Sequence, residues 1–447
     1  MEEERPMTQA ETKSGIFSWY FKVSILKRIV FATIAGAVLG IVLANMPTAT
    51  AAAYAANVKF FGDLFIRLLQ MIVVPVILFS VIGGVSALNP AKLGRIGGRL
   101  VALYLITTFI AVALAVGAAL IFQPGVGLNI MGAEGVAGKA NTAPALATVL
   151  LNLVPQNPFN AIVQGQLLPI LFFAICFGIG LSLIRSSTDG EIRKAADAVY
   201  YFCTGAAEAT YKIVWGIMQY APIGIFFLIS SLFGVQGPKV VGSMMYVIVI
   251  TFGVIIIHFV VVYGGLLRMA GLSPLVALKG AREALITAFV TRSSSATLPI
   301  TIRVMKENLG VKPEVISFSA PLGATVNMDG AAVYLGVTTM FIANAIGAPL
   351  TIDQMFMVAL LGTLGAIGSA GVPGAGVIML LMVLEGIGMK IEDGSAVAAA
   401  YALMFAIDAI LDMGRTFLNV AGDVAITSHV AKKEGALDIS KWEGVQA

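Results

Sequence analysis

The stretch from Asp408 to Asp423, DAILDMGRTFLNVAGD, constrains the fold more than any other part of the chain. In an α-helix, where each residue turns by about 100°, its polar side chains form one stripe and the other faces are apolar. A soluble surface helix has the opposite pattern, a single apolar stripe. We therefore expect a helix surrounded by lipid and protein, with the stripe facing a polar site. The stripe consists of Asp408, Asp412, Arg415, Thr416, Asn419 and Asp423.

The chemistry of this stripe allows two interpretations. A structural stripe of ion pairs could simply hold helices together, although ionisable residues inside membranes are usually functional. Three carboxylates, a guanidinium, an amide and a hydroxyl are more than that structural role needs. An arginine can fork onto a carboxylate, an aspartate can hold an ammonium, and Asn and Asp oxygens suit a hard cation such as sodium. We therefore favour a binding site.

Composition assigns the whole chain to a membrane. Of its 447 residues, 58% are hydrophobic and only 12% are charged, whereas soluble domains carry about 25% charged residues. The net charge of +4 does not indicate nucleic-acid binding, and Cys176 and Cys203 form no disulfide or zinc pattern. With only His258 and His429, a histidine-built metal centre or proton relay is not indicated. His258 lies in an Ile/Val run, and we interpret it as a helix-packing residue.

Basic residues set the expected orientation. Lys22, Lys27 and Arg28 stand at the start of the first apolar run, and basic residues favour the cytoplasmic side of a membrane. We therefore expect the tail at residues 1–22 to be cytoplasmic. The apolar runs predict an all-α, multi-pass protein of the cell membrane, with eight transmembrane helices and a cytoplasmic C-terminus.

Two apolar tracts late in the chain are interrupted near their middle. TRSSSATLP (Thr291–Pro299) interrupts residues 275–304, and GAIGSAGVPGAG (Gly365–Gly376) interrupts residues 352–389. Neither tract can cross about 30 Å of hydrocarbon twice, so each is expected to form a re-entrant helical hairpin. A long apolar span follows each hairpin, interrupted by NMDG (Asn327–Gly330) in one case and by the polar stripe in the other. We expect both spans to be broken helices.

A hairpin followed by a broken helix, twice, is typical of secondary transporters with inverted repeats. Irregular backbone at membrane depth is tolerated where it lines a cavity or is buried in protein. Helix N-termini at the hairpin tips can bind an anion, and unwound carbonyls near NMDG can ligate a cation. A glycine-rich tip can also act as a gate. The residues alone thus predict a transporter.

The motifs TRSSS, NMDG, AGVPGAG and DMGRTxxNVxGD closely resemble the glutamate/aspartate:cation symporters, also called dicarboxylate/amino acid:cation symporters, and archaeal aspartate transporters in particular. The likeness covers nearly the whole chain after residue 20. It implies a homotrimer in which a transport domain slides past a static scaffold like an elevator. The implied segments are a cytoplasmic tail at 1–22, scaffold helices one and two in 23–99, transport helix three in 100–124, scaffold helices four and five in 145–233, the transport domain in 238–432 and a C-terminal tail at 433–447. After helix six, the transport domain would hold hairpin one at about 274–308, helix seven at about 312–347, hairpin two at about 351–390 and helix eight at about 393–432.

The resemblance implies a site for an acidic amino acid between the stripe and the two hairpin tips. Arg415 would bind the side-chain carboxylate of the substrate, and Asp412 would hold its ammonium. The other substrate-binding residues, which would hold the α-carboxylate, enclose the ligand or line the side-chain pocket, are Thr416, Asn419, Ser294, Val372, Gly376, Met328 and Ala331.

The resemblance also implies three sodium sites, with sodium as the coupling ion and no other cofactor. The first would use the backbone at Gly323 and Asn327 and the carboxylate of Asp423, with Asn419 nearby. The second would use the backbone at Thr325, Ala366, Ile367 and Ser369, with the Met328 sulfur nearby. The third would use Tyr104, Thr107, Thr108, Asn327 and Asp329.

Two positions bear on the substrate and the cation. Acidic-substrate members of the family usually have Thr where this chain has Ala331, which removes a hydroxyl from the side-chain pocket. Neutral-amino-acid members share the Ala but lack the arginine that is present here as Arg415, so an acidic substrate stays the first expectation. Proton-using members commonly have Asn in place of Asp423, so the aspartate favours sodium.

The same residues bear on other possible functions. A proton- or sodium-coupled C4-dicarboxylate symporter stays open, although Asp412 would face a dianion, and so does a neutral amino acid:sodium symporter. An intramembrane enzyme is not indicated, because the TRSSS serines have no Lys or His base at a plausible spacing and HExxH is absent. Two gated hairpins suit alternating access better than an open ion channel. The sequence leaves open aspartate against glutamate, the coupling ratio, any part played by protons or potassium, and an anion leak.

Overall fold

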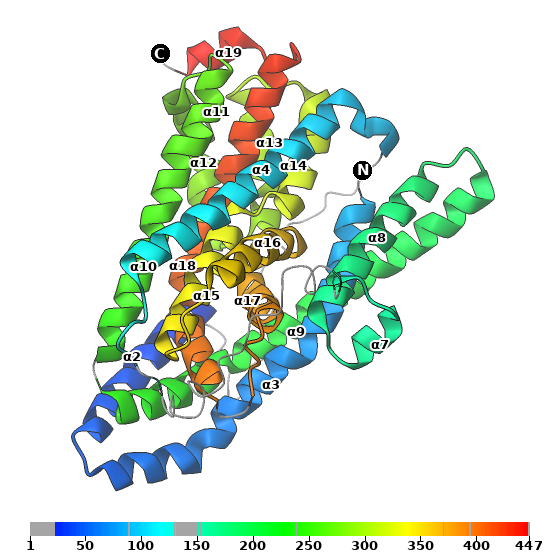
Figure 1. Cartoon of the computed structure of the whole chain (residues 1–447). Coiled ribbons are helices and arrows are strands. Elements are labelled where there is room, and N and C mark those ends of the chain that lie inside the picture. Colours follow the sequence, from blue (N-terminus) through cyan, green and yellow to red (C-terminus); the bar gives the residue numbers. More distant parts are fainter. Residues whose placement is uncertain are drawn as a thin grey trace.

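The computed structural model describes residues 23–87, 90–128, 130, 151, 153–237, 239–369, 371–392 and 395–445. Within these ranges the chain is a bundle of helices (Figure 1) with one isolated β-bridge, between Val311 and Leu437. The expected cytoplasmic tail at 1–22 and the start of the expected 145–233 segment lie outside the described residues.

Eight helical segments in the described part of the chain are long and apolar enough to cross a membrane. This number agrees with the expected eight spans and supports a polytopic membrane protein. The segments are α2 (Ile25–Ala44), α3 (Thr48–Ser86), α4 (Pro90–Phe122), α8 (Leu167–Arg185), α9 (Gly190–Gln236), α10 (Lys239–Ile257) with η1 (His258–Tyr263) and α11 (Gly264–Met269), α14 (Pro313–Val326) with α15 (Asp329–Ala345), and α18 (Ala396–Lys433). Two short helices, α7 (Pro158–Val163) and α19 (Ile439–Gly444), lie outside these segments.

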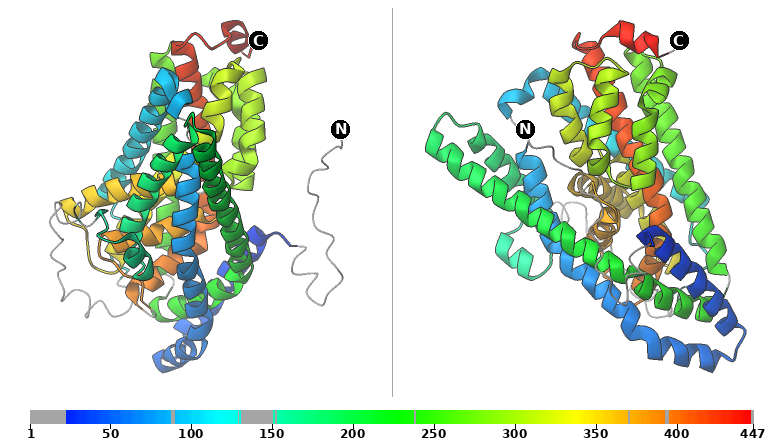
Figure 2. Two further views of the ribbon diagram at one scale, coloured as in Figure 1. Left: turned by 90° about the vertical axis from the view of Figure 1, so that its right-hand side faces the viewer. Right: turned by 180° about the vertical axis from the view of Figure 1, so that it is seen from behind.

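The helices pack in two groups. In the first, α9 packs along α2 and α3, and α8 packs against α3, so that the two longest helices run side by side (Figure 2). Small residues allow this close approach, as is common between membrane helices: a Cβ at Gly40 of α2 would lie 2.4 Å from the Cβ of Phe233 in α9. In the second group, the helices α4, α10, α11, α12, α13, α14, α16 and α17 pack around α15 and α18.

Each interrupted tract forms a pair of helices that pack against each other. The first pair is α12 (Pro274–Thr291) and α13 (Ser294–Glu307), and the second is α16 (Ile352–Gly368) and α17 (Ala375–Gly386). The helices of the first pair have 18 and 14 residues, and those of the second pair have 17 and 12. All four are shorter than the length of about 20 residues that a spanning helix needs. We call the turn at Arg292–Ser295 the first tip and that at Gly371–Gly374 the second tip.

Local chemistry shapes both tips, and they touch each other. The Ser293 hydroxyl caps α13 by accepting from the Ala296 N–H at 3.1 Å, as N-cap serines do. At the second tip, Gly374 has a φ of 83°, which glycine adopts without steric cost. The same Ser293 hydroxyl donates to the Gly371 carbonyl at 2.7 Å. One serine thus starts a helix and joins the two tips.

The expected break at NMDG is confirmed, but the expected break at the polar stripe is wrong. Between α14 and α15, Asn327 and Met328 leave the helical conformation, with ψ values of 78° and 48°. In contrast, α18 runs unbroken over 38 residues. The glycines of the stripe serve close packing: a Cβ at Gly414 would lie 2.8 Å from the Phe252 ring, and one at Gly422 would lie 2.3 Å from the Tyr263 hydroxyl.

Candidate functional site

The polar stripe of α18 contains a compact cluster of charges. The Arg415 guanidinium forms ion pairs with the Oδ1 atoms of Asp408 at 3.0 Å and Asp412 at 2.7 Å. Its carbon lies 4.4 Å from the centre of the Tyr334 ring, a cation–π geometry. Each of the three charged residues is 3% exposed. Because a buried charge without a partner is costly, these side chains hold one another in place, and the carboxylates exceed the guanidinium by one negative charge.

The cavity at this cluster brings together all nine residues expected to bind substrate. Both tips, the α14–α15 break and the stripe contribute to its wall. Its lining includes Ser294, Met328, Ala331, Val372, Gly376, Asp412, Arg415, Thr416 and Asn419. The free space is only about 10 Å³, which holds about one water molecule. A larger ligand therefore requires the tips to separate or the Arg415 side chain to move.

The sequence predicts no individual role for Arg292, which lines this cavity, or for Asp408 and Tyr334, which contact Arg415. Asp408 belonged to the stripe, and its spacing of seven residues from Arg415 places both on one helix face. Arg292 lines the cavity from the first tip and is 8% exposed, with a φ of 57°. An arginine inside an apolar tract was the available signal for it. Tyr334 is one of the largest fully buried side chains, and nothing in the sequence around it predicted a contact with Arg415.

The residues expected at the first sodium site lie together. The Asn327 amide donates to Asp423 Oδ1 at 2.9 Å and to the Asn419 carbonyl at 3.1 Å. Gly323 makes room for the carboxylate, since a Cβ there would lie 2.3 Å from Asp423 Oδ1. Asn419 in turn accepts from the Gly330 N–H at 2.8 Å. Asn327 Oδ1 is buried without a hydrogen-bond partner in the described structure, an oxygen that a cation could use.

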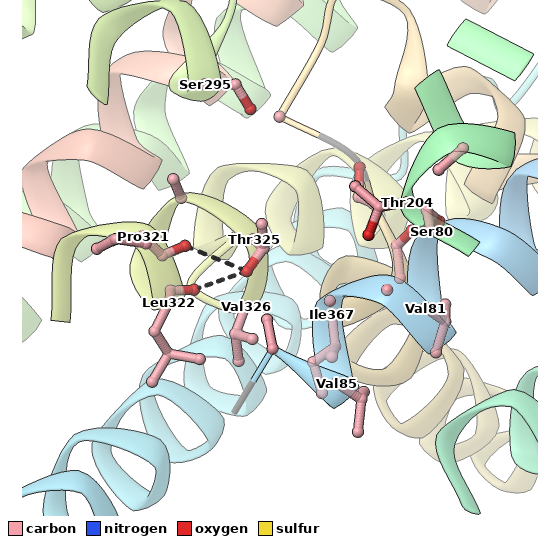
Figure 3. A pocket seen from close by; sticks show the side chains of 18 of the residues that line it. Ser80, Val81, Val85, Thr204, Ser295, Pro321, Leu322, Thr325, Val326 and Ile367 are labelled. Atoms are coloured by element: carbon pink, nitrogen blue, oxygen red, sulfur yellow. Dashed lines mark hydrogen bonds between the residues drawn. The ribbon is translucent and has the colours of Figure 1, made fainter. Parts of the chain in front are cut away.

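The residues expected at the second sodium site lie along two cavities, and Ser369 lines both. Thr325, Ile367 and Ser369 line a cavity of about 430 Å³ between α3, α9 and the two tips (Figure 3), and Ala366 is buried beside it in α16. Met328 instead lines the small cavity at Arg415, where its sulfur accepts from the Asn419 amide at 3.1 Å. The Thr325 hydroxyl donates to the carbonyls of its own helix, to that of Leu322 at 3.0 Å for example.

The residues expected at the third sodium site form a buried hydroxyl cluster. Thr108 donates to Asp329 Oδ1 at 2.6 Å and also lies 2.7 Å from the Tyr104 carbonyl, to which Thr107 donates at 3.2 Å. The Tyr104 hydroxyl points to the Ser319 carbonyl, 3.2 Å away. Asp329 is therefore held by Thr108, while the phenol of Tyr104 turns to another helix.

His258 is a buried residue that packs between helices, as expected from the sequence, and its ring also contacts a carboxylate. Its Nε2 lies 3.0 Å from Asp329 Oδ2, and the Tyr263 hydroxyl donates to the same oxygen at 2.7 Å. All three residues are at most 1% exposed. The contacts of His258 and Tyr263 with Asp329 could not be predicted from the sequence. Both residues lie in an apolar run, and Asp329 is 71 residues from His258 along the chain.

A polytopic helical bundle with a closed, charged cavity between two helix-pair tips defines a membrane transport protein. The chain belongs to the sodium:dicarboxylate symporter family, whose model matches residues 25–433. This family consists of transporters rather than enzymes.

Comparison with individual proteins gives relatives of two substrate classes. The chain is 31% identical over 431 residues to the proton/sodium-glutamate symport protein of Geobacillus stearothermophilus, covering 95% of each chain. It is 30% identical over 430 residues to the proton/glutamate-aspartate symporter of Escherichia coli K12, covering 94% of this chain and 95% of the relative. It is 33% identical over 402 residues to the human neutral amino acid transporter B(0), covering 81% of this chain and 71% of the relative.

Proposed function

We propose that this protein is a sodium-coupled secondary active symporter of acidic amino acids, aspartate, glutamate or both. The observation that carries the proposal is Arg415 held between Asp408 and Asp412 in a cavity that both tips line. The bacterial relatives support the substrate class, because one is named for glutamate and the other for glutamate and aspartate.

An acidic amino acid fits this cluster by exchange of partners. Its distal carboxylate can take the guanidinium of Arg415, and its ammonium can replace that guanidinium as the partner of Asp412. A neutral amino acid supplies no second carboxylate for Arg415. A C4-dicarboxylate supplies no ammonium and leaves Asp412 beside a dianion. Because breaking a buried ion pair costs about 3–5 kcal/mol, the acidic amino acid is the favoured ligand.

Sodium is the proposed coupling ion because two buried carboxylates lie beside neutral oxygen donors. Asp423 is 2% exposed and Asp329 is 0% exposed, and neither is paired with a Lys or Arg in the described part of the chain. Their neighbours supply amide, hydroxyl and backbone oxygens, which suit hard cations, and the His258 imidazole also contacts Asp329. Sodium ions bound there would neutralise charge that the protein leaves uncompensated, which links cation binding to formation of the site.

We further propose an elevator mechanism in a homotrimer of the plasma membrane, with both termini in the cytoplasm. Residues 100–124 and 238–432 would form the moving transport domain, including both re-entrant hairpins, and residues 23–99 and 145–233 the scaffold. The two packing groups support this division. So does the cavity of about 430 Å³ where they meet (Figure 3), because a loosely packed boundary resists sliding less than a close-packed one.

Uptake into proteoliposomes tests the proposed function. With sodium, potassium and pH gradients imposed one at a time, an inward sodium gradient alone is expected to drive accumulation of radiolabelled aspartate or glutamate. Uptake should rise steeply with sodium concentration and stay weak in choline buffer. Accumulation on a pH gradient with no sodium present would instead assign the protein to proton-coupled transport.

Ala331→Thr tests the side-chain pocket. Ala331 lines the cavity and is 2% exposed. The added hydroxyl is expected to tighten aspartate or glutamate binding by up to about tenfold, because a hydrogen bond to a charged group contributes about 1.5–3 kcal/mol and water can replace it in part. The sodium dependence should stay the same. Calorimetric titration with aspartate, glutamate, succinate and serine in matched sodium measures both effects.

The opposite result would change the substrate assignment. If the threonine variant binds every acidic ligand more weakly, Ala331 marks a pocket shaped for a larger or less acidic molecule. The neutral amino acid transporter among the relatives makes a neutral substrate the function to test next.

A further inference from the structure

A single π turn interrupts the helix that carries His258. The turn, η1, covers His258–Tyr263 and joins α10 to α11 without ending the helix. In an α-helix, residues five apart point about 140° away from each other, at about 100° per residue. A π turn closes i to i+5 hydrogen bonds and often marks a functional site. Here it brings both rings to one carboxylate, in edge-to-face contact with centres 4.9 Å apart.

Both carboxylate oxygens of Asp329 contact polar side chains, and these side chains come from two different helical segments. Oδ2 lies 3.0 Å from His258 Nε2 and accepts from the Tyr263 hydroxyl at 2.7 Å, both from η1. Oδ1 accepts from Thr108 of α4 at 2.6 Å. Asp329 itself opens α15 directly after the backbone break at Met328. Contacts from η1 and from α4 therefore fix the orientation of the Asp329 carboxylate, although the backbone at Met328, just before it, is irregular.

The two sides of this carboxylate differ in chemistry. The Oδ1 side carries Thr107 and Thr108, which are expected at the third sodium site, and both hydroxyls lie within hydrogen-bond distance of the Tyr104 carbonyl. The Oδ2 side carries an imidazole and a phenol, surrounded by apolar residues of η1. His258 is 0% exposed and does not line the substrate cavity, so it contacts neither the proposed amino acid nor solvent.

We propose that His258 is a positioning residue for cation coupling. Together with Tyr263 it holds Oδ2 of Asp329, so that Oδ1 and the Thr108 hydroxyl are presented to sodium. The inference rests on the proposed sodium coupling and adds a residue outside the expected ligand set. Partners that orient a metal ligand are often nearly as important as the ligand, and their loss lowers metal affinity by about 10–100-fold. His258 should thus control sodium affinity and leave amino acid affinity at saturating sodium unchanged.

The test measures aspartate binding to the purified full-length protein by calorimetry over a range of sodium concentrations. His258→Phe keeps a ring and removes the nitrogen, and it is expected to raise the half-saturating sodium concentration by about tenfold, the lower end for loss of such a partner. Tyr263→Phe is expected to shift it in the same direction. His258→Gln places an amide N–H near the position of Nε2 and should restore most of the sodium affinity. Aspartate affinity at saturating sodium should stay at the value of the unsubstituted protein in all three.

His429→Gln is the matched control, because its ring bonds to the Leu266 carbonyl at 2.7 Å and not to a carboxylate. An unchanged half-saturating sodium concentration in His258→Phe and Tyr263→Phe would overturn the inference. So would a lower one, since the histidine would then compete with the cation. If His258→Phe does not fold, His258→Gln and Tyr263→Phe still decide the matter. Absence of sodium dependence in the unsubstituted protein would instead reject the proposed function itself.

Discussion

Replacing Arg415 by Cys or Thr is expected to abolish binding of aspartate and glutamate. The guanidinium is the only cation that forms an ion pair with Asp408 or Asp412 in the described structure, and it is the proposed partner of the substrate's distal carboxylate. Truncating one member of a buried, hydrogen-bonded charge pair costs about 2–5 kcal/mol. The ammonium of a small neutral amino acid could still pair with Asp412, so the variant is expected to shift its preference toward serine or alanine.

Calorimetric titration in saturating sodium measures this effect. Arg303→Thr is a matched control, since Arg303 lies on α13, pairs with Glu283 and is about half exposed. The control should bind aspartate as the unsubstituted protein does. If aspartate affinity of the Arg415 variants stays within about tenfold, or 1.4 kcal/mol, Arg415 does not bind the substrate carboxylate.

Gly330→Ala is expected to disrupt the substrate and cation sites together. A Cβ at Gly330 would lie 2.0 Å from the Arg415 carbonyl oxygen and 2.6 Å from its carbonyl carbon. Both atoms belong to the backbone of α18, so no side-chain rotation relieves the clash. The Gly330 N–H also donates to Asn419 at 2.8 Å, and this bond would break if α15 moved away. We expect lost aspartate binding, lost sodium dependence and a stability decrease of about 1–3 kcal/mol, as for overpacked cores.

Thermal unfolding and aspartate titration of the same preparation check this prediction. Gly253→Ala is the control, because Gly253 lies within α10 and a Cβ there would meet no atom within 4 Å. The control should be neutral or slightly more stable, since alanine favours a helix over glycine by about 1 kcal/mol. Normal binding by Gly330→Ala would show that α15 and α18 are not packed as closely as described.

The break at Asn327 and the continuous α18 show how far local patterns predict backbone structure. Both segments are apolar helices interrupted by polar residues. NMDG changes the backbone, whereas the stripe on α18 changes only which side chains face the site. A sequence pattern reports polarity directly, but it does not distinguish a polar backbone break from a polar helix face. A polar helix face such as that of α18 stays helical when neighbouring segments contact its polar side chains. Here Tyr334 contacts Arg415, and Asn327 donates to Asp423.

The proposed substrate cavity was more predictable than its surroundings. Eight of its nine expected residues lie in the family motifs, and Ala331 directly follows NMDG. The helical spacing of the stripe alone places Asp412, Arg415, Thr416 and Asn419 on one face. Arg292 belongs to the TRSSS motif, but the motif predicted no role for its side chain. The bond from Ser293 to Gly371 was not predicted, because it joins two turns that are 78 residues apart.

The sequence by itself determined that this chain lies in a membrane, where the two helix pairs turn, where NMDG breaks a helix and which helix carries charge. These properties depend on hydropathy, helical periodicity and helix-breaking residues, all of which act over a few neighbouring positions. Only the tertiary structure decided which donor meets which carboxylate. Asp329 takes partners that are 71, 66 and 221 residues away, and a histidine in an apolar run has the same local pattern whether it packs against lipid or holds a buried aspartate.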